Sequence, residues 1–163
     1  MTTRPFFSEV RQDDALARPL LEDLAVEYST RYGSSVKRML DWLRGNPADE
    51  FAPPHGCLLI GVVDGQPVTG GAFRRFGVVE GDETAELKRI WTDSRYRQRG
   101  YGRMLLAELE SRIRALGYRR VYLTTGDRQP EAEALYTAAG YTRLTGPRPG
   151  GEMHAMAFEK RLP

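Results

Sequence analysis

The chain has 163 residues, of which 24 are Lys or Arg and 22 are Asp or Glu, so its net charge at pH 7 is only +2. This length suits one domain with a sound core, and the near-neutral charge, without any run of five basic residues, argues against nucleic acid as the main ligand. With one cysteine, two histidines, no signal-peptide core and no membrane-length apolar run, we expect no disulfide within the chain, no metal site and a cytoplasmic protein.

The N-terminal third is predicted to contain a short strand and two helices. Residues 6–11 suit a strand, and the helical pattern that follows has Pro19 either in its first turn or at a kink. That pattern ends at Gly33, a typical C-cap residue, and one of the serines after it can cap a second helix over residues 36–44. Residues 47–54 are predicted to be a loop.

Three strands and two turns are predicted in the middle of the chain. The strands are residues 57–63, 66–76 and 83–92. Asp64 and Gly65 are typical of a type I′ hairpin turn between the first two strands, and the pair Gly70–Gly71 suggests a bulge. A second turn is expected at Gly81–Asp82.

The C-terminal part alternates between helix and strand. An apolar face at helical spacing predicts a helix over residues 104–116, which Gly117 ends, and the apolar run 121–125 predicts a strand. A further helix is expected to begin near Pro130 and to end at Gly140. The last two strands are predicted at residues 141–145 and 153–160. Hairpins before one β-α-β crossover indicate an α/β (α+β) protein with a largely antiparallel sheet.

The most informative stretch is the Gly-rich turn Arg97-Gln98-Arg99-Gly100-Tyr101-Gly102, which lies between a predicted strand and a predicted helix. The N–H groups of a helix N-terminus lack intrahelical acceptors, and the helix dipole adds partial positive charge. Glycines let the backbone approach a ligand closely, and arginines add full charges. The turn therefore predicts a site for phosphate or pyrophosphate. Because R-x-x-G-x-G is expected by chance roughly 0.2 times in such a chain, its place between strand and helix is what carries the argument.

The sequence contains neither the P-loop G-x-x-x-x-G-K-[ST] nor the dinucleotide-binding G-x-G-x-x-G. R-x-x-G-x-G after a strand instead resembles the pyrophosphate-binding motif of the GCN-type N-acetyltransferases, the GNAT superfamily. Downstream, residues 134–141 read Ala-Leu-Tyr-Thr-Ala-Ala-Gly-Tyr and resemble that family's second motif, A-L-Y-x-x-x-G-[FY]. One helix and one strand separate the two motifs, as in the family, and the resemblance covers residues 57–160 well.

The resemblance implies a single N-acetyltransferase domain over residues 1–163 with a GNAT-like fold. That fold has a mixed, largely antiparallel sheet of roughly six to seven strands with about four helices, and its central parallel pair of strands splays at the cofactor cleft. The resemblance also implies acetyl-CoA as co-substrate, no metal, and a primary amine as acceptor, whose identity stays open. We expect no nucleic-acid or membrane partner, and a monomer or homodimer.

The resemblance further implies which residues hold the cofactor. The Gly-rich turn would bind the pyrophosphate through backbone N–H groups, and the end of the preceding strand would pair with the pantetheine arm. The end of the strand after the crossover helix would also contribute. The cofactor-binding residues predicted in this way are Ile90, Trp91, Thr92, Arg97, Gln98, Arg99, Gly100, Tyr101, Gly102, Arg103 and Thr125. The alternative for Arg97 and Arg99 is a solvated surface turn.

Tyr136 and Glu86 are the catalytic candidates. In the family, a tyrosine at the position of Tyr136 lies near the CoA sulfur, where a phenol that is protonated at neutral pH can act as general acid toward the leaving thiolate. The alternative is a core aromatic residue. In histone-acetylating members, a glutamate at the position of Glu86 acts as base through water. The alternative for Glu86 is a salt bridge to Lys88 or Arg89.

The function implied is an acetyl-CoA-dependent N-acetyltransferase with direct transfer to an amine. The alternative is a non-catalytic acyl-CoA-binding module, a sensor or regulator, which would need the Gly-rich turn but neither Glu86 nor Tyr136. His154 is expected to be structural. The segment in which the family usually builds its acceptor pocket contains here Glu27, Tyr28, Arg31 and Tyr32.

Overall fold

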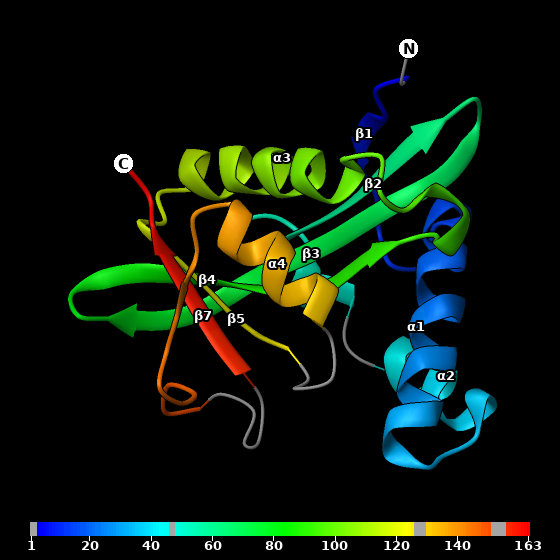
Figure 1. Ribbon diagram of the computed structural model, residues 1–163, viewed down its shortest axis with the longest axis horizontal. Coiled ribbons are helices and arrows are strands. Elements are labelled where there is room, and N and C mark those ends of the chain that lie inside the picture. The colour runs from blue at the N-terminus through cyan, green and yellow to red at the C-terminus, as the bar shows by residue number, and fades with distance from the viewer. Residues whose placement is uncertain (1–2, 46–47, 126–129, 151–155) are drawn as a thin grey trace.

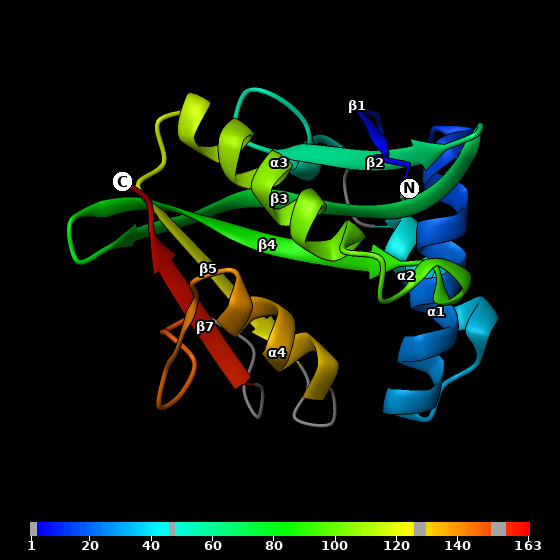
Figure 2. The same ribbon diagram turned by 45° about the horizontal axis from the view of Figure 1, so that its top comes forward.

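A seven-stranded sheet with helices on both faces organises the protein (Figure 1). The computed structural model describes residues 3–45, 48–125, 130–150 and 156–163. The strands are β1 (Phe6–Glu9), β2 (Cys57–Val63), β3 (Gln66–Val79), β4 (Asp82–Thr92), β5 (Arg120–Thr125), β6 (Thr142–Arg143) and β7 (Met156–Arg161). The α-helices are α1 (Arg18–Tyr32), α2 (Val36–Gly45), α3 (Tyr101–Ala115) and α4 (Pro130–Ala138). Two apolar cores result: α3 and α4 pack on one face of the sheet, and α1 and α2 pack on the other (Figure 2).

The sheet confirms the predicted fold class, because it is largely antiparallel with one parallel pair. Its strand order is β1-β2-β3-β4-β5-β7-β6, and among the described strands only β4 and β5, which α3 connects, run parallel. This parallel pair matches just three residues on each side, Thr84–Glu86 with Arg120–Tyr122. Both strands continue past these residues without pairing to each other. The central pair is therefore splayed, as expected.

Local signals in the sequence act where they were predicted to act. Pro19 lies in the first turn of α1, and Gly33 ends that helix with a left-handed φ of 64°. Ser35 Oγ accepts a hydrogen bond from the backbone N–H of Arg38 at 3.1 Å and so caps α2. The turn between β2 and β3 has positive φ at both Asp64 and Gly65, as a type I′ hairpin requires.

Some predicted bounds are wrong by a few residues. β3 continues to Val79, because the turn is made by Glu80–Gly81, both with positive φ, and not by Gly81–Asp82. α3 begins at Tyr101, three residues before the apolar pattern, because Gly100 in a left-handed conformation is its N-cap. β6 is shorter than predicted, and Met153, the expected start of the last strand, lies outside the described residues.

The predicted bulge lies opposite Gly71, but the extra residue belongs to β4. Arg89 and Ile90 together face Gly71, and Arg89 has a left-handed φ of 59°. A Cβ on Gly71 would come within 2.6 Å of Ile90 Cδ1, so the end of the Ile90 side chain would have to shift to admit a larger residue there. Leu87 and Ile90 pack in the core with α3, whereas Arg89 contacts Leu43 of α2 on the other face. All four residues of Leu87–Ile90 line one pocket, at the edge of β4 that β5 leaves unpaired.

Candidate active site

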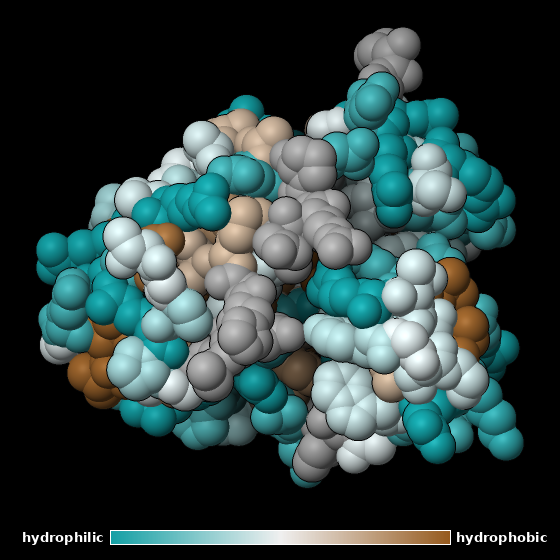
Figure 3. Space-filling model, turned by 60° about the horizontal axis from the view of Figure 1, so that its bottom comes forward, coloured by the Kyte–Doolittle hydropathy of each residue, from teal (hydrophilic) through white to brown (hydrophobic). Residues whose placement is uncertain are grey.

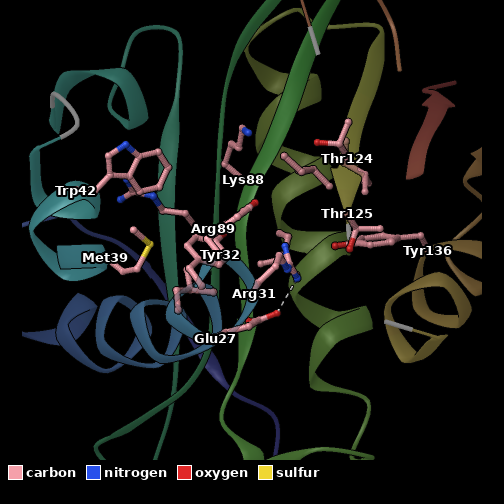
Figure 4. Close-up of a pocket in the computed structure, with 15 residues that line it drawn as sticks. Glu27, Arg31, Tyr32, Met39, Trp42, Lys88, Arg89, Thr124, Thr125 and Tyr136 are labelled. Atoms are coloured by element: carbon pink, nitrogen blue, oxygen red, sulfur yellow. Dashed lines mark hydrogen bonds and ion pairs between the residues drawn. The ribbon is translucent and has the colours of Figure 1, made fainter. Parts of the chain in front are cut away.

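A pocket of about 480 Å³ opens where β4 and β5 part. The helical wall, from α1 and α2, includes Glu27, Tyr28, Arg31, Tyr32, Met39 and Trp42. The floor is formed by residues 87–90 of β4 and 123–125 of β5, and Tyr136 of α4 completes the lining (Figure 4). The space-filling view is hollowed between its two halves, with mostly polar side chains around the hollow (Figure 3). The pocket therefore lies between the separating ends of β4 and β5, and α4, which carries the second motif, contributes Tyr136 to it.

In the close-up view, Tyr136 extends from α4 toward Thr125 of β5, and both residues line the pocket (Figure 4). It is only 5% exposed, and its ring packs against those of Tyr141 and Phe158 with centroid separations of 5.9 and 5.6 Å. Burial, followed by the neighbouring Tyr28 phenol and Glu27 carboxylate, raises the pKa of Tyr136 above its usual value. The ring is therefore part of the core, and the hydroxyl group stays protonated at neutral pH.

The Gly-rich turn runs from a short 3₁₀ helix (Ser94–Tyr96) into α3 with left-handed backbone at Gln98 and Gly100. The first hydrogen bond of α3 joins Met104 N–H to Gly100 O at 3.1 Å. Within the described part of the chain, no acceptor binds the N–H groups of residues 101–103, and Gly100 has no side chain to cap them. These donors have the geometry of an anion site.

The side chains of this segment divide between solvent and core. Arg97, Arg99 and Arg103 are exposed; Arg97 Nε donates to Thr92 O at 3.3 Å. Tyr101 is buried and its hydroxyl donates to Thr3 O at 3.0 Å, so only its backbone can reach a ligand. A Cβ on Gly102 would lie only 3.3 Å from the side chain of Leu135. The absence of a side chain at Gly102 therefore lets α3 pack closely on α4.

The three predicted residues at the end of β4 use their side chains differently. Ile90 lines the pocket. Trp91 Nε1 donates to Asp23 Oδ2 at 2.8 Å, and the hydroxyl groups of Thr92 and Thr69 lie 3.0 Å apart. Trp91 and Thr92 therefore tie β4 to α1 and β3, and only their backbone could pair with a pantetheine arm. Their cofactor-binding role stays a prediction.

Glu86 lies beside the pocket and is not one of the residues that line it. Its carboxylate, whose side chain is 6% exposed, accepts a hydrogen bond from Arg74 Nε at 3.0 Å and lies 3.8 Å from Lys88 Nζ. Arg89 is engaged elsewhere: its guanidinium donates to Gln12 and to Leu43 O, and burial lowers its pKa to about 10. The salt-bridge interpretation is thus realised with Lys88 and Arg74, and the role as base stays a prediction.

Sequence reasoning missed part of the lining. Met39, Trp42 and Lys88 belong to no motif, and only their proximity to the predicted helices and strand could have pointed to them. Thr125 was predicted and lines the pocket. His154 lies outside the described residues.

The described ranges contain neither a candidate metal cluster nor a helix of membrane-spanning character. No group of three or more His, Cys, Asp or Glu among these residues is arranged to hold a metal ion. No helix among them combines the length and apolar character needed to cross a membrane.

The model of the acetyltransferase (GNAT) family matches residues 17–141, well over half of the chain. The chain belongs to the acetyltransferase (GNAT) family. GNAT proteins are acyltransferases that take the acyl group from acyl-CoA. Tyr136 of the second motif lines the pocket described above, whereas no residue of the Gly-rich turn 97–103 is part of that lining. No curated protein sequence matches the chain.

Solved GNAT-type structures share the fold over nearly the whole chain. A Klebsiella pneumoniae protein assigned as an acyl-CoA N-acyltransferase is 24% identical, with a TM-score of 0.73 and 97% of each chain covered. An acetyltransferase from Streptococcus agalactiae is 18% identical, with a TM-score of 0.71, over 96% of this chain and 98% of that one. The PaiA N-acetyltransferase from Thermoplasma acidophilum, solved with coenzyme A, is 14% identical, with a TM-score of 0.71, over 98% and 99%. These likenesses show the fold.

Proposed function

We propose that this GNAT protein is an N-acetyltransferase that uses acetyl-CoA and transfers the acetyl group directly to a primary amine. The observation that carries the proposal is the place of the pocket: it opens where β4 leaves β5, and the tyrosine of the second motif lines it. A cofactor arm that enters between two parting strands would bring its thioester to that tyrosine.

The donor would be held at two places. Its pyrophosphate would accept hydrogen bonds from the N–H groups of residues 101–103 and interact with the exposed Arg97 and Arg99. Its pantetheine arm would pair with the edge of β4 beyond Glu86, which β5 leaves without a ladder partner. In both places, backbone groups of the protein have no hydrogen-bond partner within the described chain that would compete with the cofactor.

The chemistry asked of Tyr136 is stabilisation of the leaving thiolate. The nitrogen of the unprotonated amine attacks the thioester carbonyl carbon, a C–N bond forms, and the C–S bond then breaks with its electron pair on sulfur. The hydroxyl of Tyr136 donates to that sulfur. Because the pKa of Tyr136 is raised, and a thiol has a pKa of about 8.5, complete proton transfer from phenol to thiolate is uphill. The hydroxyl would therefore act mainly as a hydrogen-bond donor, and the sulfur would take up a proton equivalent to the one that the amine loses.

The amine must lose a proton, and Glu86 is the candidate base. Since its carboxylate does not line the pocket and is bound by Arg74, it would have to act through water. The proposal does not require a dedicated base, because an amine that reaches the pocket in its neutral form can attack directly.

The non-catalytic alternative, an acyl-CoA sensor, needs the donor site alone. The enzyme is favoured by the acceptor side of the pocket, where α1 and α2 contribute aromatic and charged side chains opposite Tyr136. The test is incubation of the purified protein with acetyl-CoA and a panel of amines, followed by thiol release and by mass spectrometry of the amines. Acetylated amine supports the proposal. Tight binding of acetyl-CoA without acetylation of any amine in the panel would favour the sensor.

A further inference from the structure

We infer that the acceptor is a small amine that also carries an anionic group, such as a carboxylate, and an apolar or aromatic side group, as an aromatic amino acid does. This inference rests on the proposed function, because it concerns the acceptor side of the same pocket. It is drawn from residues of α1, α2 and β4 that belong to neither sequence motif.

The charges around the pocket are unbalanced toward positive. Its described lining contains three cationic side chains, Arg31, Lys88 and Arg89, and one carboxylate, Glu27. Glu27 and Arg31 form an ion pair at 3.2 Å and offset each other. Arg89 is held in the core by Gln12 and the carbonyl of Leu43. A pocket of this kind attracts a ligand with negative charge and disfavours one that brings a second positive charge.

Lys88 is the cation of the described lining with the fewest contacts that would compete with a bound anion. Among the described residues its ammonium forms one ion pair, with Glu86 at 3.8 Å, and no hydrogen bond. The other oxygen of that carboxylate is already bound by Arg74 at 3.0 Å. The three N–H groups of Lys88 therefore retain hydrogen-bonding capacity toward a ligand. In an α-amino acid, the carboxylate and the amine are separated by one carbon, so a carboxylate on Lys88 keeps the amine next to β4.

The helical wall supplies an open aromatic surface. The ring of Tyr28 packs edge-on against those of Tyr32 and Trp42, with centroid separations of 6.1 and 6.4 Å. Tyr32 is 55% exposed and Trp42 is 58% exposed, although both line the pocket, and Met39 lies in the same wall. Large rings left uncovered in a pocket gain from a ligand that covers them with apolar surface. This wall favours a bulky apolar side group over a hydrogen or a methyl.

The test compares acceptors that differ in the carboxylate, in the side group or in the number of positive charges. Steady-state kinetics with acetyl-CoA are measured for phenylalanine, phenylalaninamide, alanine and spermidine. We expect kcat/KM to be highest for phenylalanine, about 10-fold or more above its amide, which lacks the carboxylate. We also expect alanine to be poorer than phenylalanine and spermidine to be the poorest. A preference for the amide or for spermidine, with acetylation observed, overturns the inference and leaves the proposed function standing.

A matched pair of variants assigns the effect to Lys88. Lys88→Gln should raise KM for phenylalanine and bring the ratio of phenylalanine to its amide close to 1. Lys37→Gln, the same change at an exposed position of α2 that does not line the pocket, should keep the wild-type ratio. An unchanged ratio in Lys88→Gln contradicts the inference. So does a loss of CoA affinity in that variant by calorimetry, because Lys88 would then belong to the donor site.

A binding measurement separates failure of the inference from failure of the proposed function. If no amine is acetylated, calorimetry of the CoA-loaded protein with N-acetylphenylalanine and with its amide still reports on the anion site. Tighter binding of the carboxylate form, lost in Lys88→Gln, supports the inference even though the proposed function has failed. Equal binding of the two compounds overturns the inference.

Discussion

Arg74 Nε donates a hydrogen bond to the Glu86 carboxylate at 3.0 Å, and this contact joins β3 to β4 beside the pocket. The same guanidinium donates to Glu50 at 2.6 Å, so one arginine is shared between two carboxylates. Glu86 consequently has a structural role that is independent of any catalytic one. An experiment on Glu86 must therefore distinguish the loss of an ion pair from the loss of a base.

The variants Glu86→Gln and Arg74→Gln make that distinction, because both break the ion pair and only the first removes the carboxylate. If Glu86 is the base, Glu86→Gln lowers kcat at neutral pH by on the order of 10²-fold, and the loss shrinks at high pH, where the amine is already deprotonated. Arg74→Gln should then retain most of the activity. Rate–pH profiles check this. A loss that is equal at every pH, or equal in the two variants, leaves Glu86 with the structural role alone.

Gly100 is expected to be essential for binding the donor. Gly100→Val introduces a side chain at a φ of 82° and next to the N–H groups that would hold the pyrophosphate, so acetyl-CoA affinity should fall by at least about 10-fold. Gly117→Val is the control, since it places the same side chain at a φ of 93° beyond the other end of α3. Calorimetry on both folded variants is the measurement. Equal CoA affinity in the two would exclude the Gly-rich turn as the anion site.

At Arg89, the glycine variant is expected to be more stable than the alanine variant, which is the reverse of the usual order. Both Arg89→Ala and Arg89→Gly remove a buried guanidinium from Gln12 and Leu43 O, and each should lower the free energy of unfolding by about 1–3 kcal/mol. Glycine should nevertheless be the better replacement, by roughly 1 kcal/mol, because the backbone at Arg89 is left-handed.

The control for this order is Arg75, an exposed position of β3 without a positive φ. There the usual preference holds, and Arg75→Gly should be less stable than Arg75→Ala. Urea unfolding of the four variants decides the question. If alanine is also the better replacement at position 89, the bulge does not impose a left-handed backbone in solution.

Much of the fold could be predicted because its signals are local. Asp64-Gly65, Gly33 and Ser35 act through their own backbone or through that of residues three or four positions away, and the structure has the turn and both caps as expected. The bulge was harder. The signal in the sequence was Gly71, which is merely the residue that the Ile90 side chain approaches. The residue with the left-handed backbone is Arg89, which is held by tertiary contacts such as its hydrogen bond to Leu43 O.

Part of the pocket lining coincides with residues that the sequence singled out, and the rest comes from distant segments that the fold brings together. Tyr136 and Thr125 line the pocket, and both lie within or next to recognisable stretches. The partnership of Glu86 with Arg74 depends on strand register, and the exposed ring of Trp42 lines the pocket because α2 packs on α1. No pattern of residue spacing in the sequence indicates either of these two contacts.

Steady-state kinetics of Tyr136→Phe test the central claim most directly. The change keeps the ring that packs on Tyr141 and Phe158 and removes only the hydroxyl group, so thermal stability and CoA affinity should survive. Turnover should fall by roughly 10- to 10³-fold, equally in kcat and in kcat/KM, because the hydroxyl acts only as the thiolate leaves. Tyr141→Phe, which removes a hydroxyl bound to Glu110 outside the pocket, should keep its turnover. Wild-type turnover in Tyr136→Phe would contradict the account and leave Tyr136 as a core residue.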